Sequence, residues 1–97
     1  MFEWDEDKRK LTLEKHGLDF LDAAEVFAED HLVLTARSDI EQRRIAIGPV
    51  NGVAIAVVFT MRGETIRIIT ARRARRNERE AYDAHVARRN AENQKPD

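Results

Sequence analysis

Arginine is the residue type that the second half of this chain offers for chemistry. Between Thr60 and Tyr82, seven arginines face only three acidic residues, Glu64, Glu78 and Glu80. A guanidinium stays charged at physiological pH, and its planar set of donors can bind two oxygens of one phosphate. So many fixed positive charges on one short stretch predict a phosphate-binding surface. The seven are Arg62, Arg67, Arg72, Arg73, Arg75, Arg76 and Arg79.

Length and composition bound what can position these arginines. The 97 residues are 42% hydrophobic, which is enough for one modest core. Without cysteine, the chain can form neither a disulfide nor a cysteine-ligated zinc site. Apolar runs stay far below the ~18 residues that span a membrane, and no signal-peptide pattern opens the chain. We therefore expect a cytoplasmic protein with a single domain over residues 1–97, in which 83–97 form an extended C-terminal helix and tail.

The net charge of −1 is an average over two unlike halves. The segment from Met1 to Asp30 holds ten acidic residues and only four basic ones, whereas the arginine-rich stretch reverses that balance. Nucleic-acid binding depends on the charge of one surface and not on the average over the chain. The low net charge therefore does not exclude a nucleic-acid partner.

Two helices are predicted in the first half. Asp5 is a good N-cap for a helix over 6–15 with Leu11 facing inward, and His16-Gly17 is a typical helix end. Asp19 caps a second helix that is expected to end near Glu29. Its buried stripe follows helical spacing and consists of Phe20, Ala23, Ala24 and Phe27.

Four strands follow, over residues 31–37, 43–50, 53–59 and 64–70, with a loop over 38–42. Asn51-Gly52 predicts a tight type I′ hairpin, and Arg62-Gly63 predicts the next turn. The continuous apolar run from Val53 to Phe59 indicates a central strand that is buried on both faces. The connections are short, so we expect antiparallel pairing.

Residues 70–76 connect the last strand to a final helix, for which Asn77 and Glu80 form a capping-box pattern. The helix is expected to fray near Asn93. The predicted order is ααββββα: an α+β fold in which helices pack on an antiparallel four-stranded meander.

Several motifs in this order resemble the BrnT family of bacterial type II toxins, whose fold is RelE-like. The resemblance covers Met1 to about Tyr82, and the long last helix over 83–97 departs from it. The matching segments are Phe2–Asp5 (FEWD), Lys15–Phe20 (KHGLDF), Arg44–Gly48 (RIAIG) and Arg67–Ala74 (RIITARRA), followed by Glu78 and Tyr82.

The resemblance implies a ribonuclease that arrests translation by cutting RNA. It also implies a ribbon-helix-helix antitoxin, similar to BrnA, that neutralises the toxin. The pair would repress its own operon, with operator DNA bound only through the antitoxin. These partners make a hetero-oligomer the expected assembly, with no membrane involved.

Cleavage of RNA without a metal ion requires activation of the 2′-hydroxyl, stabilisation of the negative charge on the phosphate, and protonation of the leaving oxygen. Arg67 is the foremost candidate to stabilise charge, because it lies mid-strand on the face opposite Ile66 and Ile68. Its alternative role is that of a solvated strand arginine. Arg44 follows the same logic on the second strand.

Three further residues complete the predicted catalytic set. His16 can act as acid or base near neutral pH, although a helix-capping role also explains it. Glu64 is a possible general base if it lies near Arg67, and otherwise a solvated turn carboxylate. Tyr82 can stack on a base or contact phosphate, or simply pack the helix on the sheet.

Lys15, Arg72, Arg73 and Arg76 are predicted to bind RNA phosphates, with ordinary surface charge or carbonyl capping as the alternative. No cofactor is predicted, and no metal site, since His31 and His85 lack spaced partner ligands. A non-catalytic module that uses the same basic patch to hold nucleic acid or the antitoxin stays open as a second function. A pure scaffold is the third.

Overall fold

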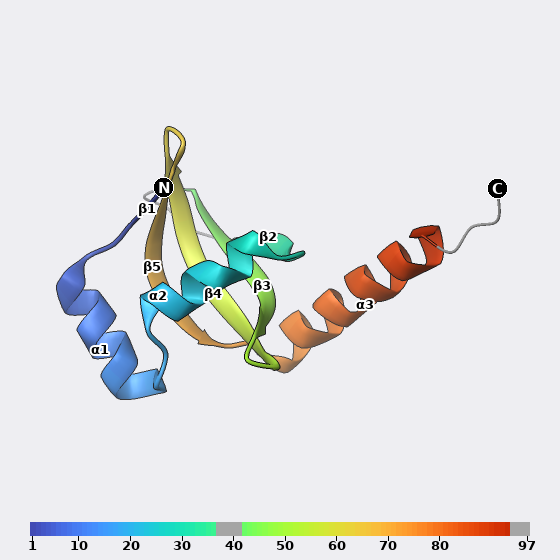
Figure 1. The fold of residues 1–97 in the computed structure, drawn as a ribbon, viewed down its shortest axis with the longest axis horizontal. Helices are drawn as coiled ribbons and strands as arrows, with labels where there is room; N and C mark the ends of the chain where they lie inside the picture. Colours follow the sequence, from blue (N-terminus) through green and yellow to red (C-terminus); the bar gives the residue numbers. More distant parts are fainter. Residues whose placement is uncertain (37–41, 94–97) are drawn as a thin grey trace.

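The computed structural model describes residues 1–36 and 42–93, and Figure 1 shows the arrangement of their helices and strands. Most of the predicted loop over 38–42 and the tail over 94–97 lie outside the described residues. The elements in chain order are β1 (Phe2–Glu3), α1 (Glu6–His16), α2 (Phe20–Ala23), the 3-10 helix η1 (Ala24–Ala28), β2 (Leu32–Ala36), β3 (Arg43–Val50), β4 (Val53–Arg62), β5 (Thr65–Arg73) and α3 (Arg76–Asn93).

The α+β fold and the antiparallel meander are confirmed, but the sheet has five strands in the order β1-β5-β4-β3-β2. The added strand, β1, pairs in parallel with β5, so that Phe2 lies beside Ile66 and Glu3 beside Arg67. The backbone N–H of Ile66 donates to the carbonyl of Met1 at 2.9 Å. Two residues are too few to give a strand pattern, which is why the sequence did not predict this strand.

The predicted hairpin and central strand are both confirmed. Asn51 and Gly52 have φ of 51° and 78°, the two left-handed values that a type I′ turn requires. In β4, Ala56 and Val57 are fully buried although they point to opposite faces of the sheet. β4 therefore forms the centre of the sheet, and the pairing register with β4 determines which side chains of β3 and β5 lie on each face.

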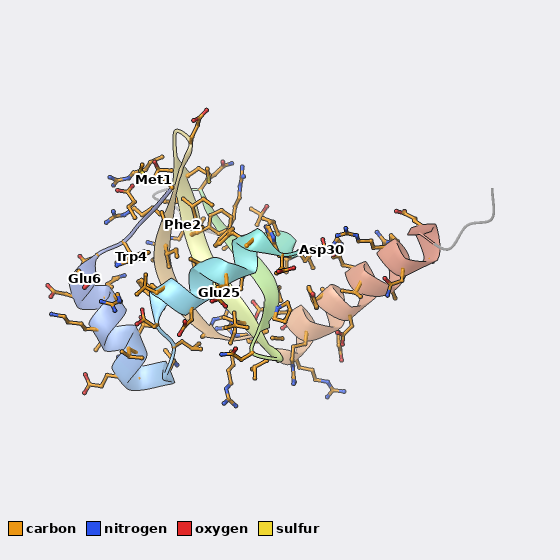
Figure 2. All side chains as sticks on the ribbon, in the orientation of Figure 1. Met1, Phe2, Trp4, Glu6, Glu25 and Asp30 are labelled. Atoms are coloured by element: carbon orange, nitrogen blue, oxygen red, sulfur yellow. The ribbon has the colours of Figure 1, made fainter. Side chains whose placement is uncertain are left out.

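One face of the sheet carries the main core, which α2 and η1 cover (Figure 1). Phe27 makes edge-on contacts with Phe59 of β4, at a centroid distance of 4.9 Å, and packs beside Phe2 at 5.6 Å. Trp4 packs on Phe20 at 6.1 Å. Figure 2 shows Phe2 and Trp4 on the segment that runs from the sheet into α1, so both aromatic residues of this segment pack on the body of the molecule.

The predicted second helix is wrong in its length. Of the predicted helix, only the four residues of α2 are α-helical, and the chain continues as the 3-10 helix η1. The three residues per turn of η1 rotate Val26 into the core, where its exposure is 0%. The inward residue of α1 is also different from the prediction: Thr12 is buried, whereas Leu11 is 48% exposed. Arg9 joins α1 to the start of α2 by donating from Nε and Nη2 to the two carboxylate oxygens of Asp19, at 2.8 and 3.0 Å.

The last helix begins at Arg76, two residues earlier than a cap at Asn77 predicts, and the Asn77/Glu80 capping box is wrong. Glu78 closes the first turn instead, because its Oε1 accepts the backbone N–H of Arg75 at 2.7 Å. Past its first turns, where it contacts β2 and β3, α3 extends away from the body of the molecule (Figure 1).

Candidate active site

The strand register decides which arginines share a face. Arg67 of β5 lies opposite Thr60 of β4, and Arg44 of β3 lies opposite Phe59. Because facing alternates along a strand, Arg43 shares the face of Thr60 and Arg67. Arg44 falls on the other face, where Phe59 packs against η1. The structure therefore brings Arg43 and Arg67 together and separates Arg44 from both.

A hollow of about 180 Å³ lies where the first turn of α1 meets β5. Its charged lining consists of Asp5, Lys8, Arg43 and Arg67, and Ile68 and Ile69 complete it. The Asp5 Oδ1 oxygen accepts the backbone N–H groups of Asp7 and Lys8 at 2.8 and 3.3 Å, which starts α1 here. Helix capping thus places a carboxylate and an ammonium beside the two strand guanidiniums.

Glu3 of β1 lies beside Arg67 on the neighbouring strand and orients its side chain. The Glu3 Oε2 oxygen lies 3.6 Å from Arg67 Nη1, and Oε1 lies 3.8 Å from Arg62 Nε. Both separations exceed hydrogen-bonding distance, and Glu3 Oε1 is buried without a hydrogen-bond partner. Arg67, with 30% of its side chain exposed, is therefore oriented by charge and keeps its donors available for a ligand.

Two further hollows continue from the first. One, of about 170 Å³, lies between α1 and β5 and is lined by Lys8, Leu11, Thr12, Lys15, His16, Ile69 and Thr70. The other, of about 190 Å³, contains His16 and Arg73 together with residues of the α1–α2 connection and the β3–β4 hairpin. Lys8 and Ile69 are common to the first two, and His16 is common to the last two. We call the three together the α1–β5 groove.

The α1–β5 groove contains four of the sequence-predicted site residues, Lys15, His16, Arg67 and Arg73. Lys8, Thr12 and Lys15 are spaced by four and three residues, so they face the same way. His16 is the last residue of α1, and Gly17 ends the helix with φ of 67° and a backbone N–H to the Leu13 carbonyl. Within the described residues, the side chains of Lys8, Lys15 and His16 make no ion pair with an acidic residue.

Arg72 is engaged elsewhere. Its Nη1 and Nη2 donate to the two oxygens of Glu78 at 2.6 and 3.0 Å, and the Glu78 side chain is only 5% exposed. The hydrogen bonds from Arg72, together with that from the Arg75 backbone, lower the pKa of Glu78 in spite of its burial. We call this pair the Arg72–Glu78 clamp, because it ties the end of β5 to the first turn of α3.

The other predicted residues do not reach the first hollow. Glu64 occupies the β4–β5 turn, about 10 Å along the strand from Arg67. Tyr82 lies on α3 with its ring 6.4 Å from that of His85, and burial, followed by the charges of Asp30 and Asp83, raises its pKa. Figure 2 shows Asp30 at the end of η1, on the side of α3. Arg76 pairs with Glu80 at 3.1 Å on an exposed helix face.

Asp5, Lys8 and Arg43 were missed as candidate site residues, although each left a signal. Arg43 has the same parity as Ile45 and Ile47, so strand alternation alone assigns it to the face opposite Arg44. Lys8 lies one helical heptad before Lys15. Asp5 was recognised only as a cap. None of these signals shows that α1 docks against β5, and that docking creates the hollow.

The comparisons with known proteins agree with this fold. The chain is similar to the ribonuclease toxin BrnT of Brucella abortus, solved as a crystal structure at 1.1 Å, with 40% sequence identity and a TM-score of 0.65. That match covers 78% of this chain and 99% of the other. A comparison with curated proteins finds no match.

Residues 4–78 match the sequence model of the family described as "Ribonuclease toxin, BrnT, of type II toxin-antitoxin system". The chain therefore belongs to the BrnT family of ribonuclease toxins and is an endoribonuclease of a type II toxin–antitoxin system. Such a system includes a cognate antitoxin as partner. The family match ends at Glu78, so Tyr82 and nearly all of α3 lie beyond it.

Neither a metal-binding cluster nor a membrane-spanning helix is found in the part of the chain that the structure describes. No three or more histidine, cysteine, aspartate or glutamate side chains of residues 1–36 and 42–93 cluster as a metal ion would need. Among the helices of the same ranges, none combines the length and apolarity needed to cross a membrane.

Proposed function

We propose that this toxin cuts RNA without a metal ion, in the α1–β5 groove, and thereby arrests translation. One observation carries the proposal: Asp5, Lys8, Arg43 and Arg67, from a helix and two strands, converge on one hollow. Three cations and one carboxylate around a small cavity suit a phosphate that must be held while a neighbouring hydroxyl loses its proton.

In the proposed reaction, the scissile phosphate lies in the first hollow with its non-bridging oxygens on Arg67 and Lys8. The 2′-oxygen of the preceding ribose attacks phosphorus, and the bond to the 5′-oxygen breaks, which leaves a 2′,3′-cyclic phosphate and a 5′-hydroxyl. Fixed cations stabilise the extra negative charge that develops between these states. Glu3 favours this geometry, because its 3.6 Å contact orients Arg67 without occupying all its donors.

Asp5 is our candidate for the base. Helix capping uses its Oδ1 atom, which leaves Oδ2 as the carboxylate oxygen that can accept the 2′-hydroxyl proton. His16 is our candidate acid, which protonates the leaving 5′-oxygen; it lines the second hollow together with Lys8, which also lines the first. Lys15 and Arg73 bind the flanking phosphates. Catalytic roles for Arg44, Glu64 and Tyr82, and phosphate-binding roles for Arg72 and Arg76, stay predictions.

The remaining steps follow from membership of a toxin–antitoxin system. We propose that a ribbon-helix-helix antitoxin covers the groove in the cytoplasm, so that RNA cannot enter it. Toxin and antitoxin together then act as corepressor of their operon, with the antitoxin alone touching operator DNA. The cationic lining of the groove would suit an acidic antitoxin segment as well as it suits RNA.

The test is incubation of the purified toxin with RNA in EDTA, in parallel for the wild type and three variants. Asp5→Asn keeps a good N-cap but removes the base, so we expect a folded protein with at least a hundredfold lower cleavage rate. His16→Gln tests the acid. Arg44→Ala tests the predicted arginine on the other face, and its loss should leave cleavage nearly unchanged if the groove alone is the active site. If wild-type toxin leaves RNA intact but binds it tightly, the protein is a non-catalytic binding module.

A further inference from the structure

The third hollow of the α1–β5 groove combines apolar and polar side chains. Four apolar side chains, which we call its floor, come from three segments: Leu18 from the α1–α2 connection, Val50 from the end of β3, and Val53 and Ile55 from β4. Val53 is 41% exposed, which leaves an apolar surface open to solvent at the mouth. A phosphate would gain nothing from such a floor, whereas a flat aromatic ring would bury it.

The rim of this hollow carries groups that can hold a ring in place. His16 and Arg73 line it, and both side chains have planar faces on which an unstacked base can lie. Asp22 and Asn51 line it as well and offer hydrogen-bonding groups near the same floor. Stacking planes, an apolar floor and a few polar groups are the features with which proteins bind single bases of RNA.

Among the residues that line the third hollow, Asp22 indicates the kind of ligand. Within the described part of the chain, its carboxylate has no hydrogen-bond donor and no ion-pair partner, although Arg73 lines the same hollow. A carboxylate in a cationic groove weakens the binding of phosphate, so its usefulness there lies in accepting hydrogen bonds from neutral N–H groups. Asp22 is thus placed to read a base edge, whereas Arg73 of the same hollow can bind the phosphate next to that base.

We infer that the third hollow is a nucleobase pocket selective for guanine, next to the cleaved phosphate. This inference rests on the proposed function. Guanine presents two N–H donors side by side on its Watson–Crick edge, and these match the two oxygens of Asp22. Adenine and cytosine place an acceptor beside their amine, and uracil flanks its single N–H with two carbonyls. The volume of about 190 Å³ is below the ~300 Å³ at which pockets for larger ligands begin, which suits one ring system.

Continuity with the cleavage site sets where the base is read. His16 lines both the second and the third hollow, so a strand lying on Lys8 and Lys15 reaches the base pocket at the end of α1. The preference should therefore fall at one fixed position, within a nucleotide or two of the cut, and not on the RNA as a whole.

The first experiment maps the 5′ ends produced from a randomised RNA. Wild type should favour guanine at one position about tenfold or more over uracil, in keeping with the ~1–3 kcal/mol of a good base contact. Asp22→Ala should reduce that ratio to about twofold or less. Glu25→Ala is the matched control, because Glu25 carries the same charge on the nearby η1 (Figure 2) but does not line the hollow, and this variant should keep the full ratio.

The second experiment needs no cleavage. Guanosine 5′-monophosphate, added to ¹⁵N-labelled toxin, should shift the backbone amides of Asp22, Val53 and Arg73, whereas uridine 5′-monophosphate should shift them far less. If the toxin cuts RNA without any base preference, or with one that Asp22→Ala leaves intact, the inference is overturned. If no RNA is cut but guanosine monophosphate shifts these amides, the proposed function fails and the pocket stands.

Discussion

The two ends of β5 carry the same residue type on the same face of the sheet and use it in different ways. Near the start, Arg67 lies 3.6 Å from Glu3, an acid that is 36% exposed. Near the end, Arg72 is hydrogen-bonded through both terminal nitrogens to Glu78, which is 5% exposed. An arginine that makes a bidentate bond to a buried carboxylate has few donors left, whereas one held by a distant acid can still bind phosphate.

The difference comes from the elements that meet β5. At its start the neighbour is β1, a strand of two residues that supplies one loosely paired acid and leaves the hollow beside α1 open. At its end the neighbour is α3, whose first turn needs an acceptor for the Arg75 backbone N–H. Glu78 is that acceptor, and the Arg72 guanidinium neutralises the charge of the Glu78 carboxylate. An arginine-rich sequence therefore does not by itself identify the arginines that bind a ligand, because the distance and burial of the nearest acidic side chain determine whether the guanidinium donors are free.

The largest expected effect separates the two ends directly. Arg67→Ala should lower kcat/KM for RNA by about 100- to 1000-fold, the usual range for a lost transition-state donor, and should leave the melting temperature nearly unchanged. Arg72→Ala should lower the melting temperature and should change kcat/KM much less than Arg67→Ala does. Cleavage kinetics and thermal unfolding of both variants check this, and equal cleavage by Arg67→Ala and wild type would contradict it.

The Arg72–Glu78 clamp should dominate stability. Glu78→Gln keeps the side-chain size but removes the charge that faces Arg72, so we expect a loss of about 2–3 kcal/mol in the free energy of unfolding. Glu80→Gln is the matched control, since it removes an exposed partner of Arg76 and should change stability by no more than about 0.5 kcal/mol. Urea unfolding measures both, and similar losses would mean that the clamp is not special.

The same clamp predicts a pH dependence. The pKa of Glu78 is lowered by its hydrogen bonds from Arg72 and Arg75, so the folded state binds this proton less readily than the unfolded chain does. Its contribution is therefore complete above the ordinary value of 4.5 and is lost as the pH falls through the lowered pKa. The stability difference between wild type and Glu78→Gln should be constant near neutrality and narrow in acid, as urea titrations at several pH values would reveal.

The smallest effect concerns the open end of β5. Lys8→Gln should weaken RNA binding and reduce the slope of log Kd against log salt by about 0.7, the value for one phosphate contact on a single strand. Lys10→Gln removes a charge from the same helix outside the groove and should leave the slope closer to that of wild type. Fluorescence anisotropy over a salt series measures both, and identical slopes would remove Lys8 from the phosphate contacts.

Local patterns predicted much of the fold correctly. The caps at Asp5 and Asp19, the left-handed turn at Gly17 and the Asn51-Gly52 hairpin depend on backbone preferences of a few residues, and all are present. The apolar run of β4 is buried on both faces, as its composition requires. Where two patterns competed, as at α2 and η1 or at the start of α3, packing and a buried acid overrode the local signal.

The geometry of the candidate site could be predicted only in part from the sequence. A single β-bulge in β5 explains much of what the sequence did not predict. Strict alternation would place Arg67 and Arg72, five residues apart, on opposite faces of β5. The pairing register shifts between Val58 and Phe59, whose partners are Thr70 and Ile68, and this leaves Ile69 as an extra residue. The shift turns Arg72 toward the face of Arg67 and sends Arg73 to the other face, into the third hollow.

By itself, the sequence determined that arginines would be concentrated in the second half of the chain, that Arg67 would lie on a strand with its side chain on the face opposite Ile66 and Ile68, and that the chain would resemble the BrnT family. Those conclusions depend on residue type and on spacing along the chain. Only the tertiary structure decided that Asp5, Lys8 and Arg43 surround Arg67, and that Arg72 is bound to Glu78. The physical reason is that charge, unlike helix or strand preference, acts between neighbours in space, and those neighbours come from distant parts of the chain.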